Sequence, residues 1–203
     1  RNDIDFFNKL TAEKNKNIIV PPVGSNQLTV VDKAGNVATA LHSCMSWPWM
    51  NGLFVDGISV CAAILHYASG VPKPGGKINS IVSPNMLTLD NKPILASGSP
   101  SSSSIDNIYQ NTVNILDFGM TPEKSVNLPR FGGSTMEEPE AVRFEVDYNE
   151  RIMKGLEKLG MKIRRVSPWN WSMGAFEGIY MDSETGIAHA CGDPRRNSMA
   201  LAV

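Results

Sequence analysis

The stretch "VPPVGSNQLTVVDKAGN", residues 20–36, admits two interpretations of its central serine. On the structural interpretation, Pro-Pro and Gly-Ser end one segment, and the apolar run from Gln27 predicts a strand that turns at residues 33–36. Ser25 is then an ordinary serine at the start of a β-hairpin. On the chemical interpretation, the bond between Gly24 and Ser25 is cut, which frees a serine α-amine. Both interpretations share the hairpin and differ in what Ser25 does.

A serine hydroxyl is a weak nucleophile at neutral pH unless a base lies beside it. A freed serine carries such a base in its own α-amine, whose ordinary pKa near ~8 lets it accept the hydroxyl proton. Gly24 has no side chain to obstruct attack of the Ser25 hydroxyl on its carbonyl, which would convert the peptide bond into an ester that water can hydrolyse. The Gly-Ser pair alone is more typical of a turn, so the choice depends on the rest of the chain.

Composition and charge are typical of a soluble globular protein that forms one domain or one piece of a larger fold. Of the 203 residues, 42% are hydrophobic and 19% are charged, and the formal net charge is −1. This net charge produces no broad electrostatic field that would attract nucleic acid or an anionic membrane, so we expect neither as a partner.

No apolar run approaches the ~20 residues of a spanning helix, and "RNDIDFFNKL" lacks the pattern of a signal peptide. The compartment stays open between cytoplasmic and periplasmic or secreted, because a segment upstream of Arg1 could carry an address.

The residues that most often bind metals are few and scattered. They are Cys44, Cys61, Cys191, His42, His66 and His189. An odd number of cysteines without a C-x-x-C pair argues against a disulfide framework and against a zinc site, and the histidines lack an H-x-x-x-H spacing. We therefore expect buried thiols and no metal site.

Hydrophobic periodicity and turn residues predict a mixture of helices and antiparallel strands. Residues 79–99 predict two strands around a turn at residues 90–93, and "GAFEGIYMD" with "GIAHACGDP" predicts another hairpin around residues 183–186. Between them, "AVRFEVD" and "KIRRVS" predict strands that flank an amphipathic helix at residues 148–160. This order lacks the alternation of a doubly wound parallel sheet and indicates the α+β class.

The clearest helix is predicted directly after "GSPSSSS". Six side chains fall on one side of it at helical spacing: Ile105, Ile108, Tyr109, Thr112, Val113 and Leu116. We expect Ser104 to cap its N-terminus and Gly119 to end it. A second helix is predicted to begin with Thr121 as N-cap and Pro122 at its first position, and to end before Pro129.

Four segments of the chain carry a specific pattern in a fixed order: "GSNQLTVVDKAGNVATALHS", "SIVSPNMLTLD", "ASGSPSSSS" with the following helix and "NLPRF", and "CGDPRR". With this order and spacing, the chain resembles the gamma-glutamyltranspeptidase family from about Gly24 to Arg196. Members of that family are N-terminal-nucleophile hydrolases, made as one precursor and self-cleaved into two chains. The resemblance implies a four-layer αββα sandwich, two antiparallel sheets between helical layers, to which this chain supplies the C-terminal part.

The resemblance also implies a division of the chain and a partner. Residues 1–24 would be the tail of the large-subunit region or a propeptide linker, and residues 25–203 the small, catalytic subunit. We expect the large subunit from the same precursor as the partner, in a heterodimer or in a dimer of heterodimers. The resemblance implies no cofactor.

Matching the family motifs residue by residue implies roles for four serines. Ser25 matches a threonine nucleophile that is released by cleavage after Gly24, and a serine keeps both the hydroxyl and the α-amine. Ser43 matches a second threonine, whose hydroxyl supports the nucleophile; the alternative is an inward-facing strand serine. Ser101 and Ser102 match a Gly-Gly pair whose backbone amides bind the oxyanion, and the helix start that follows would favour negative charge there.

The positions that hold the glutamyl group in the family differ in this chain. The corresponding and neighbouring positions are Met45, Trp47, Ala63, His66, Ser80 and Ile81. A thioether, a methyl group and an imidazole replace groups that clamp an α-ammonium, and isoleucine replaces one serine of a pair that holds the α-carboxylate. Aromatic and thioether side chains suit an apolar or flat acyl group. The alternative is that these side chains only pack a loop.

Three hypotheses about function follow. In the first, Ser25 attacks the amide bond of a non-glutamyl small molecule, so that the protein is an amidohydrolase or acylase. In the second, true gamma-glutamyl hydrolase or transferase activity survives through residues of the missing chain. In the third, the 24 residues before Ser25 stay attached, the serine amine remains in a peptide bond, and the protein is a non-catalytic structural or binding subunit.

Overall fold

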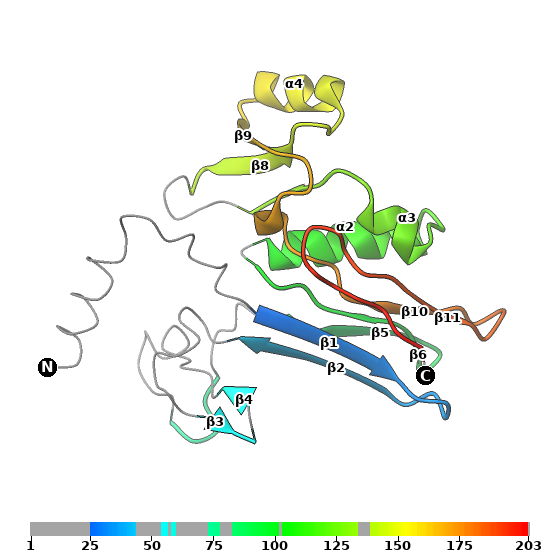
Figure 1. The fold of residues 1–203 in the computed structure, drawn as a ribbon. Coiled ribbons are helices and arrows are strands. Elements are labelled where there is room, and N and C mark those ends of the chain that lie inside the picture. The colour runs from blue at the N-terminus through cyan, green and yellow to red at the C-terminus, as the bar shows by residue number, and fades with distance from the viewer. Residues whose placement is uncertain are drawn as a thin grey trace, which may run out of the picture.

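The computed structural model describes residues 25–43, 54–56, 58–59, 73–77, 83–101, 103–133 and 139–202. Its elements in chain order are β1 (Ser25–Val31), β2 (Val37–Ser43), β3 (Phe54–Val55), β4 (Ile58–Ser59), β5 (Asn85–Leu89), β6 (Lys92–Ser97), α2 (Ser104–Leu116), α3 (Pro122–Val126), β7 (Phe131–Gly132), β8 (Ala141–Glu145), α4 (Glu150–Lys158), β9 (Lys162–Val166), the 3₁₀ turn η2 (Trp171–Met173), β10 (Ile179–Met181) and β11 (Ala188–Ala190). Figure 1 shows the hairpin β1–β2 below, α2 and α3 in the middle, and the unit of β8, α4 and β9 at the top.

The first two strands form the hairpin that the opening stretch predicts. β1 and β2 pair antiparallel along their whole length, with Ser25 opposite Ser43. The carboxylate of Asp32 closes the turn by accepting hydrogen bonds from the backbone N–H groups of Ala34 and Asn36. The predicted hairpin is thus confirmed, and its open end carries two of the candidate serines.

A four-stranded antiparallel sheet in the order β11-β10-β6-β5 contains the other two predicted hairpins, which are also confirmed. In the tight turn between β5 and β6, Asp90 and Asn91 have φ values of 49° and 62°. Such turns favour Asp and Asn because their short polar side chains tolerate positive φ. Pairing of β6 with β10 brings together segments that lie more than 80 residues apart in the sequence.

This sheet is covered on both faces. On one face, a hydrophobic core joins β6, α2, α3 and the segment before β10: Leu95, Ile115, Val126 and Phe176. Side chains alternate along a strand, so Ala96 points to the opposite face, and it is fully buried as well. There the hairpin contacts the sheet, because the hydroxyls of Thr29 and Thr39 donate to the carbonyl oxygens of Glu177 and Ser97 at 3.0 and 3.3 Å. Hairpin, sheet and helices are therefore three successive layers (Figure 1).

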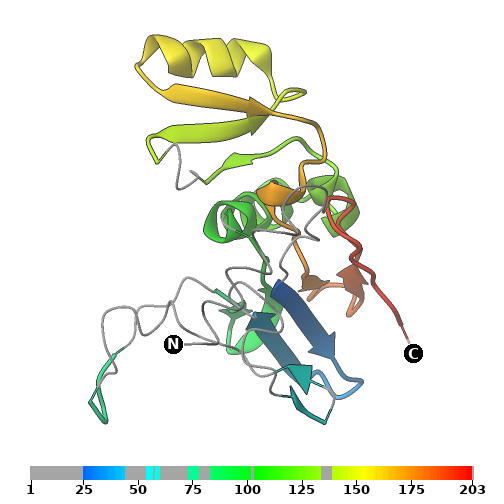
Figure 2. The ribbon, with the colours of Figure 1, turned by 60° about the vertical axis from the view of Figure 1, so that its left-hand side comes forward.

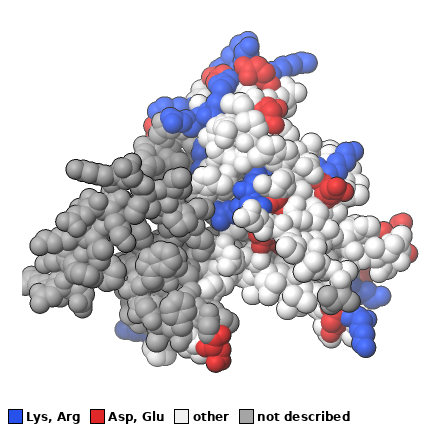
Figure 3. Space-filling view, in the orientation of Figure 1, with Lys and Arg blue, Asp and Glu red and all other residues white. Residues whose placement is uncertain are grey.

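A small second sheet in the order β7-β8-β9 extends beyond α2, as Figure 2 shows. The predicted strand, helix and strand of this region are confirmed as β8, α4 and β9, and β8 pairs with β9 in parallel. Exposed charges on this unit pair with one another: Arg165 with Glu150 and Glu157, and Lys162 with Glu140. Figure 3 accordingly shows both signs intermixed at the top of the molecule.

The predicted apolar face of α2 is wrong. Ile105 is 65% exposed and Tyr109 is 67% exposed, whereas the buried positions are Ser104, Asn107, Asn111 and Ile115. The predicted cap is wrong too, because the helix already begins at Ser104, and Ser103 is the N-cap without a side-chain capping bond. The reason is that α2 is packed through a row of buried hydrogen bonds, which hydrophobic periodicity does not detect.

The short helix α3 begins and ends where the sequence predicts. The side chain of Thr121 accepts a hydrogen bond from the backbone N–H of Lys124, and Pro122 takes the first helical position. Both features stabilise a helix start, because they satisfy or remove N–H groups that have no partner within the helix.

Among the residues that the structure describes, no group of three or more His, Cys, Asp or Glu could hold a metal ion. Within the same ranges, no helix combines the length and the apolar character needed to cross a bilayer. Cys191 is half-buried, and burial raises the pKa of its thiol to about 11. Cys44 and Cys61 lie outside the described residues.

Candidate active site

Ser25 and Ser43 meet at the open end of the hairpin. Ser25 is the first residue of β1 and Ser43 the last residue of β2, so the strand register places them opposite one another. The Oγ of Ser25 donates a hydrogen bond to the Oγ of Ser43 at 2.8 Å. A second hydroxyl at this distance can accept a hydrogen bond from the first and thereby hold the first oxygen in one orientation for attack. Gly24, on the other side of the candidate scissile bond, lies outside the described residues.

The segment after β6 reaches the same end of the hairpin. Gly98 and Glu177 exchange two backbone hydrogen bonds, which extend the pairing of β6 with β10 by one step. Gly98 also lies directly against the side chain of Gln27, and no space is left there for a Cβ atom. Gln27 is two residues after Ser25, and Ser101 is three residues after Gly98. Figure 1 accordingly shows the start of β1 beside the start of α2.

Ser101 has a φ of 112°, a backbone conformation in which glycine is favoured. Its hydroxyl donates to the carbonyl oxygen of Ser172 at 2.9 Å and accepts from the backbone N–H of Ser103 at 3.2 Å. The family resemblance implies a glycine at this position, and the serine found here adopts a backbone conformation typical of glycine. Ser102, the other half of the candidate oxyanion pair, lies outside the described residues.

The helix α2 starts immediately after this turn. Its N-terminus carries the positive end of the helix dipole, which favours negative charge close to the turn. The carboxylate of Asp106, in the first turn of the helix, accepts a hydrogen bond from the N–H of Gly133 at 2.7 Å.

A row of buried polar side chains runs from the turn along α2. Asn107 donates to the hydroxyl of Ser99, Asn111 donates to the side-chain oxygen of Asn107, and Ser125 donates to the side-chain oxygen of Asn111, each at 2.7 Å. All four side chains are at most 1% exposed. We call them the polar ladder. It ties the turn to α2 and, through Ser125, to α3.

Arg143 of β8 is a charged side chain that bonds directly to residues of the candidate oxyanion turn and its surroundings. Its Nη2 donates to the Oγ of Ser103 at 2.9 Å, and its Nη1 donates to the Oγ of Ser172 at 2.8 Å. Its Nε donates to the carbonyl oxygen of Gly133 at 3.0 Å. Burial lowers the pKa of this guanidinium, and the charge of Asp106 acts against that shift. Sequence reasoning missed Arg143, because its partners lie 10 to 40 residues away.

The motifs "NLPRF" and "CGDPRR" form a buried network of charges. Arg130 pairs with Asp193, and Arg195 pairs with Glu145, both at 2.5 Å. Desolvation lowers the pKa of Arg130 to about 10, although Asp193 opposes this shift. Arg130 also donates to the carbonyl oxygen of Gly174, and Asp193 accepts from the N–H of Phe176. The network therefore fixes the segment between η2 and β10.

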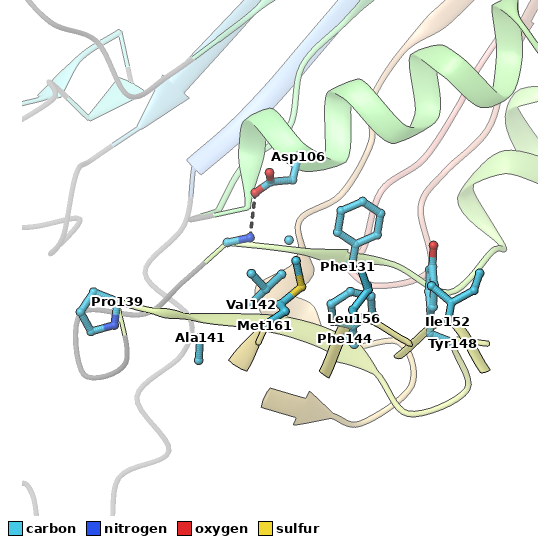
Figure 4. A pocket seen from close by; sticks show the side chains of 12 residues that line it. Asp106, Phe131, Pro139, Ala141, Val142, Phe144, Tyr148, Ile152, Leu156 and Met161 are labelled. Carbon is cyan, nitrogen blue, oxygen red and sulfur yellow. Dashed lines mark hydrogen bonds between the residues drawn. The ribbon is translucent and has the colours of Figure 1, made fainter. Parts of the chain in front are cut away.

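The candidate substrate-binding positions lie outside the described residues: Met45, Trp47, Ala63, His66, Ser80 and Ile81. The structure does show a cavity of about 720 Å³ elsewhere, between α2, β7, β8 and α4 (Figure 4). Its walls include Phe131, Val142, Phe144, Tyr148 and Met161, and neither Ser25 nor Ser43 contributes to it. This cavity is separate from the serine pair.

Comparisons of the sequence and of the structure with known proteins lead to the same family. The family model described as Gamma-glutamyltranspeptidase matches residues 12–203. The glutathione hydrolase proenzyme of Escherichia coli K12 is 29% identical over 195 residues, which cover 86% of this chain and 32% of that protein. The proenzyme of the same name from Pseudomonas aeruginosa is 23% identical over 228 residues, which cover 99% of this chain and 40% of that protein. The chain thus spans about a third of the length of these curated relatives.

Two solved structures show the same fold at low sequence identity. The gamma-glutamyltranspeptidase from Pseudomonas nitroreducens complexed with L-DON has a TM-score of 0.67 at 20% identity, with 87% of this chain and 98% of that chain covered. The cephalosporin acylase from Bacillus halodurans has a TM-score of 0.63 at 22% identity, with 80% of this chain and 31% of that chain covered. The predicted α+β sandwich is confirmed by these likenesses.

Proposed function

Because this chain belongs to the gamma-glutamyltranspeptidase family, we propose that it is the C-terminal, catalytic part of an N-terminal-nucleophile amide hydrolase that cuts its own precursor before Ser25. The observation that carries the proposal is the hydrogen bond of 2.8 Å between Ser25 and Ser43 at the open end of the hairpin. Residues 25–203 are then the small subunit, and residues 1–24 are the end of the preceding region. The partner is the large subunit from the same precursor.

Self-cleavage proceeds by attack of the Ser25 Oγ on the carbonyl carbon of Gly24. The C–N bond to Ser25 breaks as the C–O bond forms, and the proton of the hydroxyl passes to the departing amine. Water then hydrolyses the resulting ester, which leaves a carboxylate on Gly24 and a free amine on Ser25. Ser43 supports this step by accepting the hydrogen bond of the attacking hydroxyl.

The same hydroxyl then attacks the amide of the substrate. The free α-amine of Ser25 takes the proton and later returns it to the leaving amine, so that an acyl ester remains on the serine. The backbone amides of Ser101 and Ser102 donate to the oxyanion, and the N-terminus of α2 adds favourable electrostatics. Water activated by the α-amine releases the acid and restores the enzyme.

For the substrate, we propose an amide whose acyl group is apolar or flat and lacks a γ-glutamyl head. The support is the sequence itself, where Met45, Ala63, His66 and Ile81 stand in place of groups that bind glutamyl in the family. A cephalosporin acylase shares the fold, so related scaffolds accommodate other amides. The competing proposal is γ-glutamyl hydrolysis, which the glutathione hydrolase relatives favour.

The test uses the full-length precursor, with Ser25→Ala as control. Intact mass and N-terminal sequencing should find a new terminus at Ser25 in the wild type and none in the variant. A γ-glutamyl anilide and phenylacetyl and benzoyl anilides then compare the substrates. Turnover of the γ-glutamyl compound alone would refute the changed acyl specificity, and an uncut but active wild type would refute Ser25 as the nucleophile.

A further inference from the structure

Ser101 is held in its turn by one partner from a distant part of the chain, Ser172, and by one partner two residues further on, Ser103. A serine at a φ of 112° adopts a conformation that L-amino acids rarely take, so the surroundings must stabilise it. The hydroxyl of Ser101 provides this stabilisation, because it donates to the carbonyl oxygen of Ser172 and accepts from the N–H of Ser103. A glycine at this position would need neither bond, because it reaches positive φ without steric strain.

Arg143 connects both of these partners. One arm of its guanidinium donates to Ser103, directly after the turn, and the other arm donates to Ser172, which holds the Ser101 hydroxyl. The bonds therefore form a closed ring from Ser101 through Ser172, Arg143 and Ser103 back to Ser101. The rigid fork of arginine suits such a bridge, whereas the single ammonium of lysine does not reproduce its geometry.

The ring is itself anchored. Ser172 is fixed by Asn170, whose side-chain oxygen accepts from both the N–H and the hydroxyl of Ser172, at 3.0 and 2.6 Å. The Nε of Arg143 donates to the carbonyl oxygen of Gly133, which belongs to the loop after β7. Arg143 is only 5% exposed and Ser103 is 1% exposed, so water does not readily replace these bonds. The geometry of the turn thus depends on a charged side chain that comes from a different sheet.

We propose that Arg143 and Ser172 are positioning residues, which hold Ser101 in its turn so that its backbone amide faces the oxyanion. This inference rests on the proposed function, because it assigns the turn to transition-state stabilisation. Neither residue touches the reacting atoms. Loss of the ring lets Ser101 leave the strained conformation, and a misaligned donor lowers kcat more than it changes KM. The serine in place of a family glycine explains why this chain depends on the ring.

The test is a double-mutant cycle between Arg143→Gln and Ser101→Gly in the full-length precursor. The probe is the γ-glutamyl or phenylacetyl anilide, whichever the wild type hydrolyses faster. Loss of one oxyanion donor typically costs about 10²–10³ in kcat, so a misaligned donor should cost about 10- to 100-fold in Arg143→Gln. In the Ser101→Gly background, where the strain is absent, the same change should cost less than about threefold. KM should stay within about threefold throughout.

Three further variants separate positioning from a general loss of structure. Ser172→Ala keeps the carbonyl acceptor but removes the bond to Arg143, and it should lower kcat in the same direction. Arg143→Lys should not restore kcat, because it lacks the fork. Arg165→Gln is the matched control on β9, where the partners are Glu150 and Glu157, and it should leave kcat unchanged.

The outcomes distinguish the two proposals. Equal losses of kcat from Arg143→Gln with and without the Ser101→Gly substitution, or a raised KM with unchanged kcat, would overturn the positioning role while the proposed function stands. An active Arg143→Gln variant with wild-type kcat would do the same. A wild type that is neither cut before Ser25 nor active on any of the anilides would overturn both.

Discussion

At residue scale, the hydrogen bond between Ser25 and Ser43 joins two hydroxyls that lie 18 residues apart in the chain. The attacking oxygen of a serine nucleophile must be held close to a base and away from competing rotamers. A neighbouring hydroxyl with a fixed backbone restricts the Ser25 rotamer, because Ser43 is pinned by the pairing of β1 with β2.

Ser43→Ala should lower kcat for the anilide about 5-fold. A hydrogen bond contributes about 1 kcal/mol, and 1.4 kcal/mol corresponds to a factor of about ten in rate. Cleavage before Ser25 should slow in the same variant and can be followed by the appearance of two chains on a gel. Ser183→Ala, in the exposed turn between β10 and β11, is the control with the same chemical change. Unchanged rates of both steps in Ser43→Ala would contradict a supporting role.

Cys191 should be unreactive toward iodoacetamide at about pH 8. Burial raises its pKa from 9.0 to about 11, so the fraction of thiolate, the species that reacts, falls about 100-fold. Peptide mapping of the alkylated protein measures this residue separately from Cys44 and Cys61. Rapid modification in native buffer, at the rate of a short cysteine peptide, would show that the thiol is accessible and ionised.

How far the sequence predicts these site residues depends on the distance between partners. Ser25 and Ser43 are symmetrically placed about the turn at residues 33–36, so a hairpin alone brings them together. Ser101 is different, since its hydroxyl bonds to a carbonyl 71 residues away. No local pattern contains that contact, and a φ of 112° at a serine cannot be foreseen from composition.

At element scale, α2 is the informative case. The helix itself and its approximate limits follow from periodicity, but its buried side carries Asn107 and Asn111 instead of the apolar stripe. Their amides bond to each other and to Ser99 and Ser125, which lie outside this helix. The parallel pairing of β8 with β9 could not be predicted from the strand patterns either. Hydrophobic periodicity indicates which face of a strand is buried, but it does not indicate which strand lies beside it.

Asn111→Ala should destabilise the protein by about 1–3 kcal/mol. The change leaves the buried hydroxyl of Ser125 and the side-chain oxygen of Asn107 with one partner fewer, and unmet buried polar groups cost about this much. The midpoint of urea unfolding measures the effect. Asn127→Ala, at the exposed end of α3, is the matched control and should stay within about 0.5 kcal/mol. Equal shifts in the two variants would show that the polar ladder contributes nothing specific.

At the scale of the whole molecule, buried charges join the end of the chain to its centre. Glu145 of β8 accepts from Arg195, which also donates to the carbonyl oxygens of Val126 and Leu128. Because these groups are almost completely buried, removal of one partner leaves a charge without compensation.

Glu145→Gln should therefore destabilise the whole fold by about 3–5 kcal/mol, the usual cost of leaving one charge of a buried pair unpaired. Thermal unfolding followed by circular dichroism measures the loss. Glu140→Gln removes the same charge from the exposed pair with Lys162 and should leave the transition where it is. A wild-type melting curve for Glu145→Gln would mean that the network is dispensable.

Among the described residues, the hairpin and α2 both expose apolar side chains, which the proposed large subunit could cover. Leu28 and Val30 on the outer face of the hairpin are 64% and 48% exposed, and Ile105 and Tyr109 on α2 are 65% and 67% exposed. A chain that spans about a third of its relatives' length leaves ample sequence to cover such faces.

Residues 25–203 produced alone should therefore self-associate and bind a hydrophobic dye, whereas the processed full-length protein should elute as one defined heterodimer. Size-exclusion chromatography with light scattering compares the two forms. Monomeric behaviour of residues 25–203 without dye binding would contradict the need for a partner, since exposed apolar faces of this kind are normally covered.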